Sequence, residues 1–246
     1  MEEQKGIMGG RGARSSIGST SQSHTGAILT GSGMGASNIT YGTFDDSDAL
    51  KLLDDMDDVY DDPDVTDAIK LYTSNSNPNK DGYSHSQNLN YKLDNGMPLS
   101  PTEKFIDNNI QKGMHAIGKD SELVRYCHDD ILKNAGIPDY TKMSDSQLQS
   151  ALVGKTFTTT SYMSTSYDGK KNPFNPNAPQ GGGREVVMKI KAGKDTKMVF
   201  GEKTQAEIVL NKGTNFKITG IKYDGSYATP RNSRRKPRIE LEIETY

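Results

Sequence analysis

The sequence predicts an α+β domain with a mostly antiparallel sheet, preceded by a tail that has no core of its own. Three features of the chain lead to this expectation. Gly, Ser and Thr dominate the first 46 residues, apolar residues at helical spacing follow, and short runs of β-branched and aromatic residues fill the chain from residue 121 onwards. Helices followed by strands, without alternation between the two, are typical of α+β proteins.

The tail is expected to span residues 1–46 and to be flexible. Its composition buries too little apolar surface to offset the entropy lost on ordering. Hydrophobic residues make up 32% of the chain and the mean hydropathy is −0.75, which agrees with an unpacked segment. The compact domain is therefore expected at residues 47–246.

Bulk properties exclude several classes of protein. The net charge of −2 gives no reason to expect a nucleic-acid or membrane partner, and no stretch approaches the roughly 18 apolar residues of a membrane span. The start, "MEEQKGIMGGRGARSS", lacks the apolar region of a secretory signal, and the single Cys127 can form no internal disulfide. We expect a monomer that is cytoplasmic, virion-associated or exported by a route without a classical signal.

Two helices are expected at the start of the domain. The first covers "SDALKLLDDMDDVY" with Ser47 as its N-cap. Its aspartates form a solvated face, because the Gly and Glu positions of a calcium-binding loop are missing. Pro63 and Asp64 open the second helix, which continues through "VTDAIKLYTSN".

Two further helices complete the N-terminal half. "YSHSQNLNYKLDNG" predicts a helix that its Asn-Gly pair closes. "SPTEKFIDNNIQKGMHAI" predicts another, with Ser100 as N-cap, Pro101 at the first helical position and Glu103 completing a capping box.

Strands are expected from residue 121 onwards, where Gly and Pro separate most of the β-rich runs. The expected strands are "SELVRYC", "TFTTTSYMSTS", "REVVMKIKAG", "TKMVF", "QAEIVL", "TNFKITGIKY" and "RIELEIETY".

One of these strands begins with two long polar side chains, in "TQAEIVLNKGTNFKI". If the segment is extended, Gln205, Glu207 and Val209 share one face, and the opposite face is apolar and belongs in a core. An amide and a carboxylate then point to one place. A cleft explains this pattern, and so does a sheet edge with one wet face.

Two other strands carry polar side chains suited to a site. In "SYMSTS" the hydroxyls of Ser164 and Ser166 face the same way, with Thr165 opposite, and small hydroxyls can hold a carboxylate in one rotamer. In "SELVRYC" the fork of Arg125 suits phosphate. An ordinary edge strand and an ordinary salt bridge are the alternatives.

The order Arg, Ser-Thr-Ser and Gln-x-Glu on three predicted strands resembles the mono-ADP-ribosyltransferase toxin class, in particular its exoenzymes. The resemblance covers about residues 48–246 and extends to four more segments: "AIKLYTSN", "LNYKL" with Asn90, "VVMKIKAGKDTKMVF" and "EIVLNKGTNFKITGI". It implies N-terminal helices packed on a two-sheet, mostly antiparallel β core with a central NAD cleft. It also implies transfer of ADP-ribose from NAD, the substrate, to an unidentified acceptor protein.

The resemblance implies a role for each motif residue around NAD. Glu207 would stabilise the positive charge that develops on the ribose as nicotinamide leaves, and Ser164 would orient it. Arg125 would grip the pyrophosphate side, and the backbone of Tyr126 would pair with the nicotinamide amide. Two further residues, Thr165 and Ser166, would complete the shape of the strand.

Other residues would complete the cofactor and acceptor sites. Asn90 lies in the helix segment that contacts NAD in the family, and Gln205 would position the acceptor amide. In "VFGEKT", an acceptor-recognition turn, Phe200 would contact the target. In the Gly- and Pro-rich loop 167–183, Phe174 would stack on the nicotinamide ring. The residues that would reach phosphate are Lys170, Lys171 and Arg184.

Two departures from the family pattern bear on function. Asp94 stands where the family often carries an Arg, so one cofactor contact is in doubt. The pair at 205 and 207 is Gln-x-Glu rather than Glu-x-Glu, which in the family tracks asparagine-type acceptors, as in the Rho-modifying exoenzymes.

Rival functions rest on weaker patterns. Cys127 and His128 are neighbours on a strand and so point to opposite faces, and the four histidines show no zinc-binding spacing. The basic run "RNSRRKPR" is more simply a solvated loop than a nucleic-acid contact. The remaining alternatives are an NAD glycohydrolase and a non-catalytic part of a phage particle, because "MGGRGARSS" resembles the start of prophage head-associated proteins.

Overall fold

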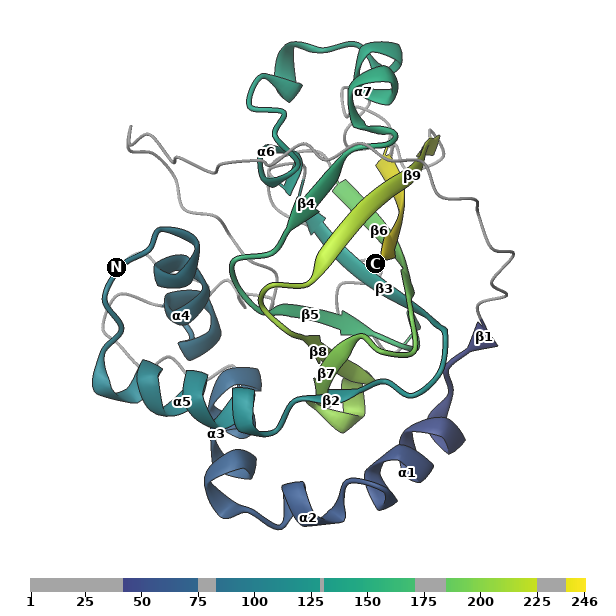
Figure 1. The fold of residues 1–246 in the computed structure, drawn as a ribbon. Coiled ribbons are helices and arrows are strands. Elements are labelled where there is room, and N and C mark those ends of the chain that lie inside the picture. Colours follow the sequence, from purple (N-terminus) through teal and green to yellow (C-terminus); the bar gives the residue numbers. More distant parts are fainter. Residues whose placement is uncertain (1–41, 75–82, 129–130, 171–184, 225–237) are drawn as a thin grey trace, which may run out of the picture.

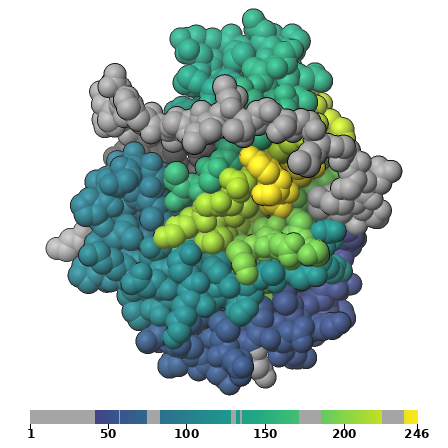
Figure 2. Space-filling view, viewed as in Figure 1, coloured from purple at the N-terminus to yellow at the C-terminus, as the bar shows by residue number. Residues whose placement is uncertain are grey.

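A computed structural model describes residues 42–74, 83–128, 131–170, 185–224 and 238–246. Helices α1 to α5 curve around one side and one end of a twisted sheet, and a small helical lobe with α7 stands at the opposite end (Figure 1). The space-filling view shows the same lobe at the top and α1 at the bottom of the molecule (Figure 2). None of the described helices is long and apolar enough to cross a membrane.

The N-terminal helices follow the predicted order. They are α1 (Asp46–Asp54), α2 (Asp57–Tyr60), α3 (Pro63–Thr73), α4 (His85–Asp94) and α5 (Pro101–Lys112). The predicted capping box of α5 is present, because the Ser100 side chain accepts from the Glu103 N–H while the Glu103 carboxylate accepts from the Ser100 N–H. Such a cap stabilises a helix by about 1 kcal/mol.

The start of α1 differs from the prediction. The N-cap is Asp45, not Ser47: the Asp45 carboxylate accepts from the N–H groups of Ser47 and Asp48 at 2.9 and 3.0 Å. A carboxylate two residues earlier satisfies the exposed N–H groups better than the serine can, and its charge favours the helix N-terminus. The expected single helix is also divided, since α1 ends at Asp54 and α2 begins at Asp57.

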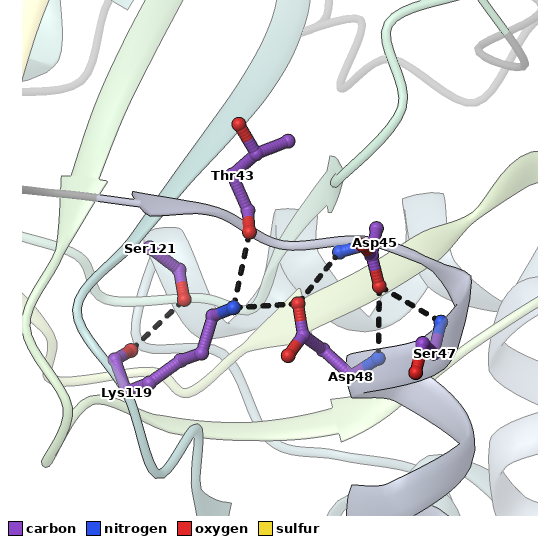
Figure 3. A network of polar contacts seen from close by, with 6 residues as sticks. All are labelled: Thr43, Asp45, Ser47, Asp48, Lys119 and Ser121. Carbon is purple, nitrogen blue, oxygen red and sulfur yellow. Dashed lines mark hydrogen bonds and ion pairs between the residues drawn. The ribbon is translucent and has the colours of Figure 1, made fainter.

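The folded domain begins before residue 47. Strand β1 (Gly42–Thr43) pairs in parallel with β3, and Phe44 is buried in the main core. Lys119 ties this segment down, because its Nζ donates to the Thr43 carbonyl at 3.0 Å and to Asp48 Oδ2 at 2.5 Å (Figure 3). Residues 42–46 thus belong to the domain, and the expectation of a flexible tail applies to 1–41, which lie outside the described residues.

A helical insertion between His128 and Thr156 was not predicted. It contains α6 (Ile131–Asn134), a 3-10 turn at Tyr140–Lys142 and α7 (Asp145–Leu152). A capping box between Ser144 and Gln147 starts α7, and this Ser-x-x-Gln spacing was the sequence signal for it. Leu148 and Leu152 anchor α7 to the main core.

The described strands form one mixed, mostly antiparallel sheet. They are β2 (His115–Ala116), β3 (Ser121–His128), β4 (Thr156–Thr158), β5 (Met163–Ser166), β6 (Glu185–Ala192), β7 (Lys197–Phe200), β8 (Glu207–Leu210), β9 (Asn215–Asp224) and β10 (Arg238–Thr245). Their order is β2-β7-β8-β5-β3-β6-β10-β9-β4, with β1 beside β3, and only the β1–β3 and β6–β10 pairs are parallel.

The α+β class is confirmed, with one change to the expected two sheets. The halves β2-β7-β8-β5 and β3-β6-β10-β9-β4 meet where β3 pairs with β5, and a single register pair, Val124 with Ser166, joins them. The two halves are therefore continuous in hydrogen bonding through this one pair. We refer to this junction as the seam.

Two apolar clusters fill the two faces of the sheet. The main core packs on one face, and the smaller cluster lies between α3, α4, α5 and the strands β7 and β8. In β8, Ile208 belongs to the main core and Val209 to the helical cluster, so both faces of this strand are buried. Neither face of β8 is exposed to solvent, so the alternative of an edge strand with one wet face does not apply to it.

Candidate active site

The segment around Gln205 is not extended as the alternation argument assumed. Strand β8 starts only at Glu207, Gln205 ends a 3-10 turn (Lys203–Gln205), and Ala206 is left-handed at φ 49°. Glu202 organises the turn, because its carbonyl accepts the N–H groups of Gln205 and Glu207 at 3.0 and 3.2 Å. The turn, and not strand alternation, therefore sets the direction of Gln205 relative to Glu207.

Glu207 is a buried carboxylate held by the same turn. Its side chain is 5% exposed, and Oε2 accepts the Glu202 N–H at 2.9 Å. The side chain lies on the backbone of Gly201, where an added Cβ would stand 2.5 Å from Oε2 and 2.7 Å from Cγ. Position 201 must therefore be glycine for the carboxylate to lie where it does.

The Ser-Thr-Ser strand β5 lies directly beside Glu207. Ser166 is its register partner, and the Ser166 hydroxyl lies 2.9 Å from the carbonyl of Gln205. Thr165 is buried and donates to the Ile208 carbonyl at 2.8 Å. Thr165 and Ser166 therefore bind the protein's own backbone and fix β5 against β8.

Arg125 reaches β5 across the seam. Its side chain is 7% exposed, and Nη1 donates to the Ser164 carbonyl at 2.6 Å. Nε is buried and has no hydrogen-bond partner among the described residues. Buried guanidinium N–H groups are seldom left unsatisfied, so this orientation suits an anionic ligand.

Two residues from the helices approach the same place. The Asn90 amide on α4 donates to the hydroxyl of Tyr72 at 2.9 Å and to the Tyr162 carbonyl at 3.1 Å. Asn90 Oδ1 is buried without a hydrogen-bond partner among the described residues. Asn90 therefore presents a second unsatisfied polar atom toward this part of the molecule.

Tyr72 on α3 is the centre of the group. Burial raises the pKa of its phenol to about 12, the hydrogen bond from Asn90 opposes that rise, and the charge of Glu207 adds to it. The positive charge of Arg125 and a hydrogen bond with Ser164 also lower the Tyr72 pKa. The pKa of this one buried hydroxyl is thus affected by four residues that the sequence placed in the site: Asn90, Arg125, Ser164 and Glu207. Tyr72 itself was quoted in "AIKLYTSN" without a role, so the sequence offered its position but not its function.

Other predicted residues lie as follows. Tyr126 is half-buried and pairs with Val187 of β6, while β5 pairs with β3 only at Val124. Lys170 is exposed, and its N–H donates to Asp168 at 2.9 Å. Phe174, Lys171 and Arg184 lie outside the described residues, as does most of the basic run at 231–238.

Phe200 is mostly buried, at the end of β7. It is 8% exposed, packs near Phe44 with ring centroids 6.4 Å apart, and donates its N–H to the Tyr60 hydroxyl at 2.7 Å. The phenylalanine closes the end of β7 as a core residue. The exposed side chains of the following turn are Lys203 and Thr204.

The rival sites gain no support from the described residues. Cys127 is half-buried against the main core, and no group of three or more His, Cys, Asp or Glu in the described part of the chain could hold a metal ion. Asp94, which replaces the family's frequent Arg, accepts a hydrogen bond from Thr160. Its carboxylate thus fastens α4 to the segment before β5.

A comparison with protein-family models identifies an ADP-ribosyltransferase exoenzyme domain over residues 60–243. The chain belongs to this family. It is an NAD-dependent mono-ADP-ribosyltransferase, and NAD is its substrate. A comparison with curated proteins finds no match.

Solved structures with the same fold are members of the toxin class. Plx2a, an ADP-ribosyltransferase toxin from Paenibacillus larvae, has 16% identity and a TM-score of 0.56 over 81% of this chain and 95% of its own. C3stau2 from S. aureus, solved with NAD, has 17% identity and a TM-score of 0.56 over 85% and 99%. The C3 exoenzyme from Clostridium limosum has 19% identity and a TM-score of 0.53 over 84% and 98%.

Proposed function

We propose that this transferase modifies an asparagine-type side chain of a protein acceptor, with Glu207 as the carboxylate beside the reacting ribose. The observation that carries the proposal is that Arg125 bonds to the Ser164 carbonyl on β5, the strand that pairs with β8 at Glu207. Structural side chains in a core rarely bring a carboxylate, a guanidinium and unsatisfied amide and guanidinium atoms together. A binding site for a charged substrate explains all of them.

The two unsatisfied atoms suit NAD. Arg125 Nε is a donor for a pyrophosphate or ribose oxygen, and Asn90 Oδ1 is an acceptor for a hydroxyl or amide N–H. Tyr126 follows Arg125 on β3, two residues after the pair that joins β3 to β5. We assign its backbone to the nicotinamide amide.

The chemistry follows from the charge that develops at the ribose. The bond between C1′ and the nicotinamide nitrogen breaks, and its electron pair leaves with nicotinamide. The carboxylate of Glu207 stabilises the resulting oxocarbenium-like carbon, because a buried negative charge acts strongly in a site that excludes water. The amide nitrogen of the acceptor then bonds to C1′ and releases a proton to water.

Gln205 positions the acceptor amide in this proposal. A glutamine can donate to the acceptor's carbonyl oxygen and accept from its NH₂ group, which suits an amide better than a cationic side chain. No general base is required when the nucleophile attacks an already formed cation, so a carboxylate at position 205 is unnecessary. Lys203 and Thr204 are the exposed side chains of the turn that contains Gln205.

Labelled NAD and a cell lysate test the proposal directly. The protein is incubated with NAD labelled in its adenylate part, with and without lysate, and nicotinamide release is measured in parallel. A labelled protein whose modified peptide carries ADP-ribose on asparagine supports the proposal. Release of ADP-ribose without any labelled protein identifies an NAD glycohydrolase instead, and modification of arginine overturns the role of Gln205.

A further inference from the structure

A cavity of about 560 Å³ lies next to Glu207, on the side of α1 and α3. Its size falls within the roughly 300–1,000 Å³ of ligand pockets. Most of its lining is apolar and comes from α1, α2, α3 and the end of β7, with Ala49, Leu50, Leu53, Tyr60, Ile69 and Phe200 as the main contributors. Arg125, Ser164 and Asn90 are not among the residues that line it, so the cavity adjoins the group around Tyr72 and shares Glu207 with it.

The floor of the cavity is held in place by hydrogen bonds. The Tyr60 hydroxyl accepts the Phe200 N–H at 2.7 Å, and the Thr66 hydroxyl donates to the Tyr60 carbonyl at 2.7 Å. These bonds join α2 to the end of β7 and to the start of α3. The cavity is therefore part of a fixed framework and does not depend on one side-chain rotamer.

The rim combines an exposed apolar residue with charges of both signs, and its acidic member, Asp46, accepts a hydrogen bond from Tyr167. Leu50 is 51% exposed, and the side chains of Lys70 and Lys203 are exposed beside it. Lys70 forms an exposed ion pair with Asp67 at 3.6 Å, and such a pair contributes little. Lys203 belongs to the same turn as Gln205.

We propose that this cavity receives an apolar side chain of the acceptor protein, one or two residues from the modified side chain, and that its lysines face an acidic residue beside it. The inference rests on the proposed transfer to a protein. Glu207 lines the cavity and also belongs to the catalytic group. An extended chain advances about 3.3 Å per residue. A neighbour of the modified residue can therefore enter the cavity while that residue lies at the carboxylate.

The chemistry of the lining suits a side chain of the acceptor protein better than it suits NAD, the other substrate. The riboses and phosphates of NAD require polar partners, which the apolar walls from α1 and α3 do not supply. An aromatic or long aliphatic side chain needs no such partners and gains free energy from burial. Positive charge at the rim then favours acceptors with Asp or Glu next to the apolar residue.

Filling the cavity tests the inference in the whole protein. Leu53→Trp places an indole inside, and Leu50→Trp blocks the mouth. Val153→Trp is the matched control, because Val153 is 44% exposed and follows α7 away from the cavity. For each variant, labelling of a lysate by labelled NAD is compared with NAD hydrolysis in the absence of lysate.

Both cavity variants are expected to lower labelling roughly tenfold or more, since one mismatched apolar group in a pocket changes specificity by that factor. Hydrolysis should stay within about twofold of wild type, and the control should change neither activity. Lys70→Glu should lower labelling at low salt, with a smaller effect at high salt.

Three results would overturn the inference, each in its own way. Unchanged labelling with a blocked mouth means that the acceptor does not use the cavity. Equal loss of labelling and hydrolysis means that the cavity serves NAD or the fold. A wild-type protein that hydrolyses NAD yet labels nothing removes the proposed transfer itself, and the inference with it.

Discussion

Gly201→Ala tests whether the position of the Glu207 carboxylate controls catalysis. An added Cβ would stand 2.5 Å from Oε2 and 2.7 Å from both Cδ and Cγ of Glu207. Since non-bonded heavy atoms prefer about 3.5–4.0 Å, the carboxylate must move by roughly 1 Å. A misplacement of about 1 Å at a catalytic group lowers kcat by as much as roughly 100-fold. We therefore expect a loss of this order in NAD hydrolysis and in transfer.

The assay must separate misplacement from unfolding. The Kd for NAD should stay within about threefold, because the movement changes one carboxylate and leaves Arg125 and Asn90 in place. Gly193→Ala is the control, since the nearest atom to its added Cβ is the Thr245 hydroxyl oxygen at an ordinary 3.6 Å. Circular dichroism and the melting temperature check the fold of both variants. A folded Gly201→Ala protein with kcat within about twofold of wild type would refute the proposed role of the Glu207 position.

The remaining predictions concern single side chains. Glu207→Gln should abolish transfer while the Kd for NAD largely survives, because the amide keeps the shape but not the charge. Gln205→Ala should lose transfer and keep NAD hydrolysis; equal loss of both would refute the division of roles. Tyr72→Phe should lower kcat/KM for NAD roughly tenfold with little loss of stability, because the ring packing remains but the buried hydrogen bonds go. Burial raises the pKa of Glu103, but the hydrogen bond from Lys92 and backbone bonds outweigh it and hold that pKa below its ordinary 4.5. Its stabilisation is thus present above about pH 4.5 and is lost as the pH falls through its lowered value. Glu103→Gln should therefore lower the free energy of unfolding by about 1–2 kcal/mol at pH 7. The free energy of unfolding, measured by urea denaturation at a series of pH values, should also fall less steeply on acidification than in the wild type.

Local signals in the sequence were sufficient for most helices and strands. Ser100 with Pro101 and Glu103 marks the start of α5 unambiguously, because each residue satisfies a specific requirement of a helix N-terminus. The α7 insertion was missed although Ser144 and Gln147 carry a related signal. Its apolar residues are few, and the neighbouring β-rich runs outweighed them.

The site was only partly predictable for a different reason. Motif order placed Arg125, Ser164 and Glu207 correctly on three strands, but the path of the chain before Glu207 depends on a left-handed alanine. A non-glycine residue with positive φ has no reliable sequence signature. Tyr72 and Asn90 lie 18 residues apart on separate helices, so their hydrogen bond is a product of tertiary packing.

The seam brings two candidate site residues, Arg125 and Ser164, together. The Ser166 hydroxyl accepts the Asp168 N–H at 3.2 Å, which turns the chain away from the sheet directly after its pair with Val124. Strand β3 continues past the seam to His128, paired along its length with β6. Arg125 is the first residue past that junction, and its guanidinium bonds back to Ser164. In an antiparallel pair with Val124 opposite Ser166, Arg125 and Tyr126 would come opposite Thr165 and Ser164, yet β5 is paired there with β8, and the bond from Arg125 to the Ser164 carbonyl is what joins the two halves of the sheet past the seam.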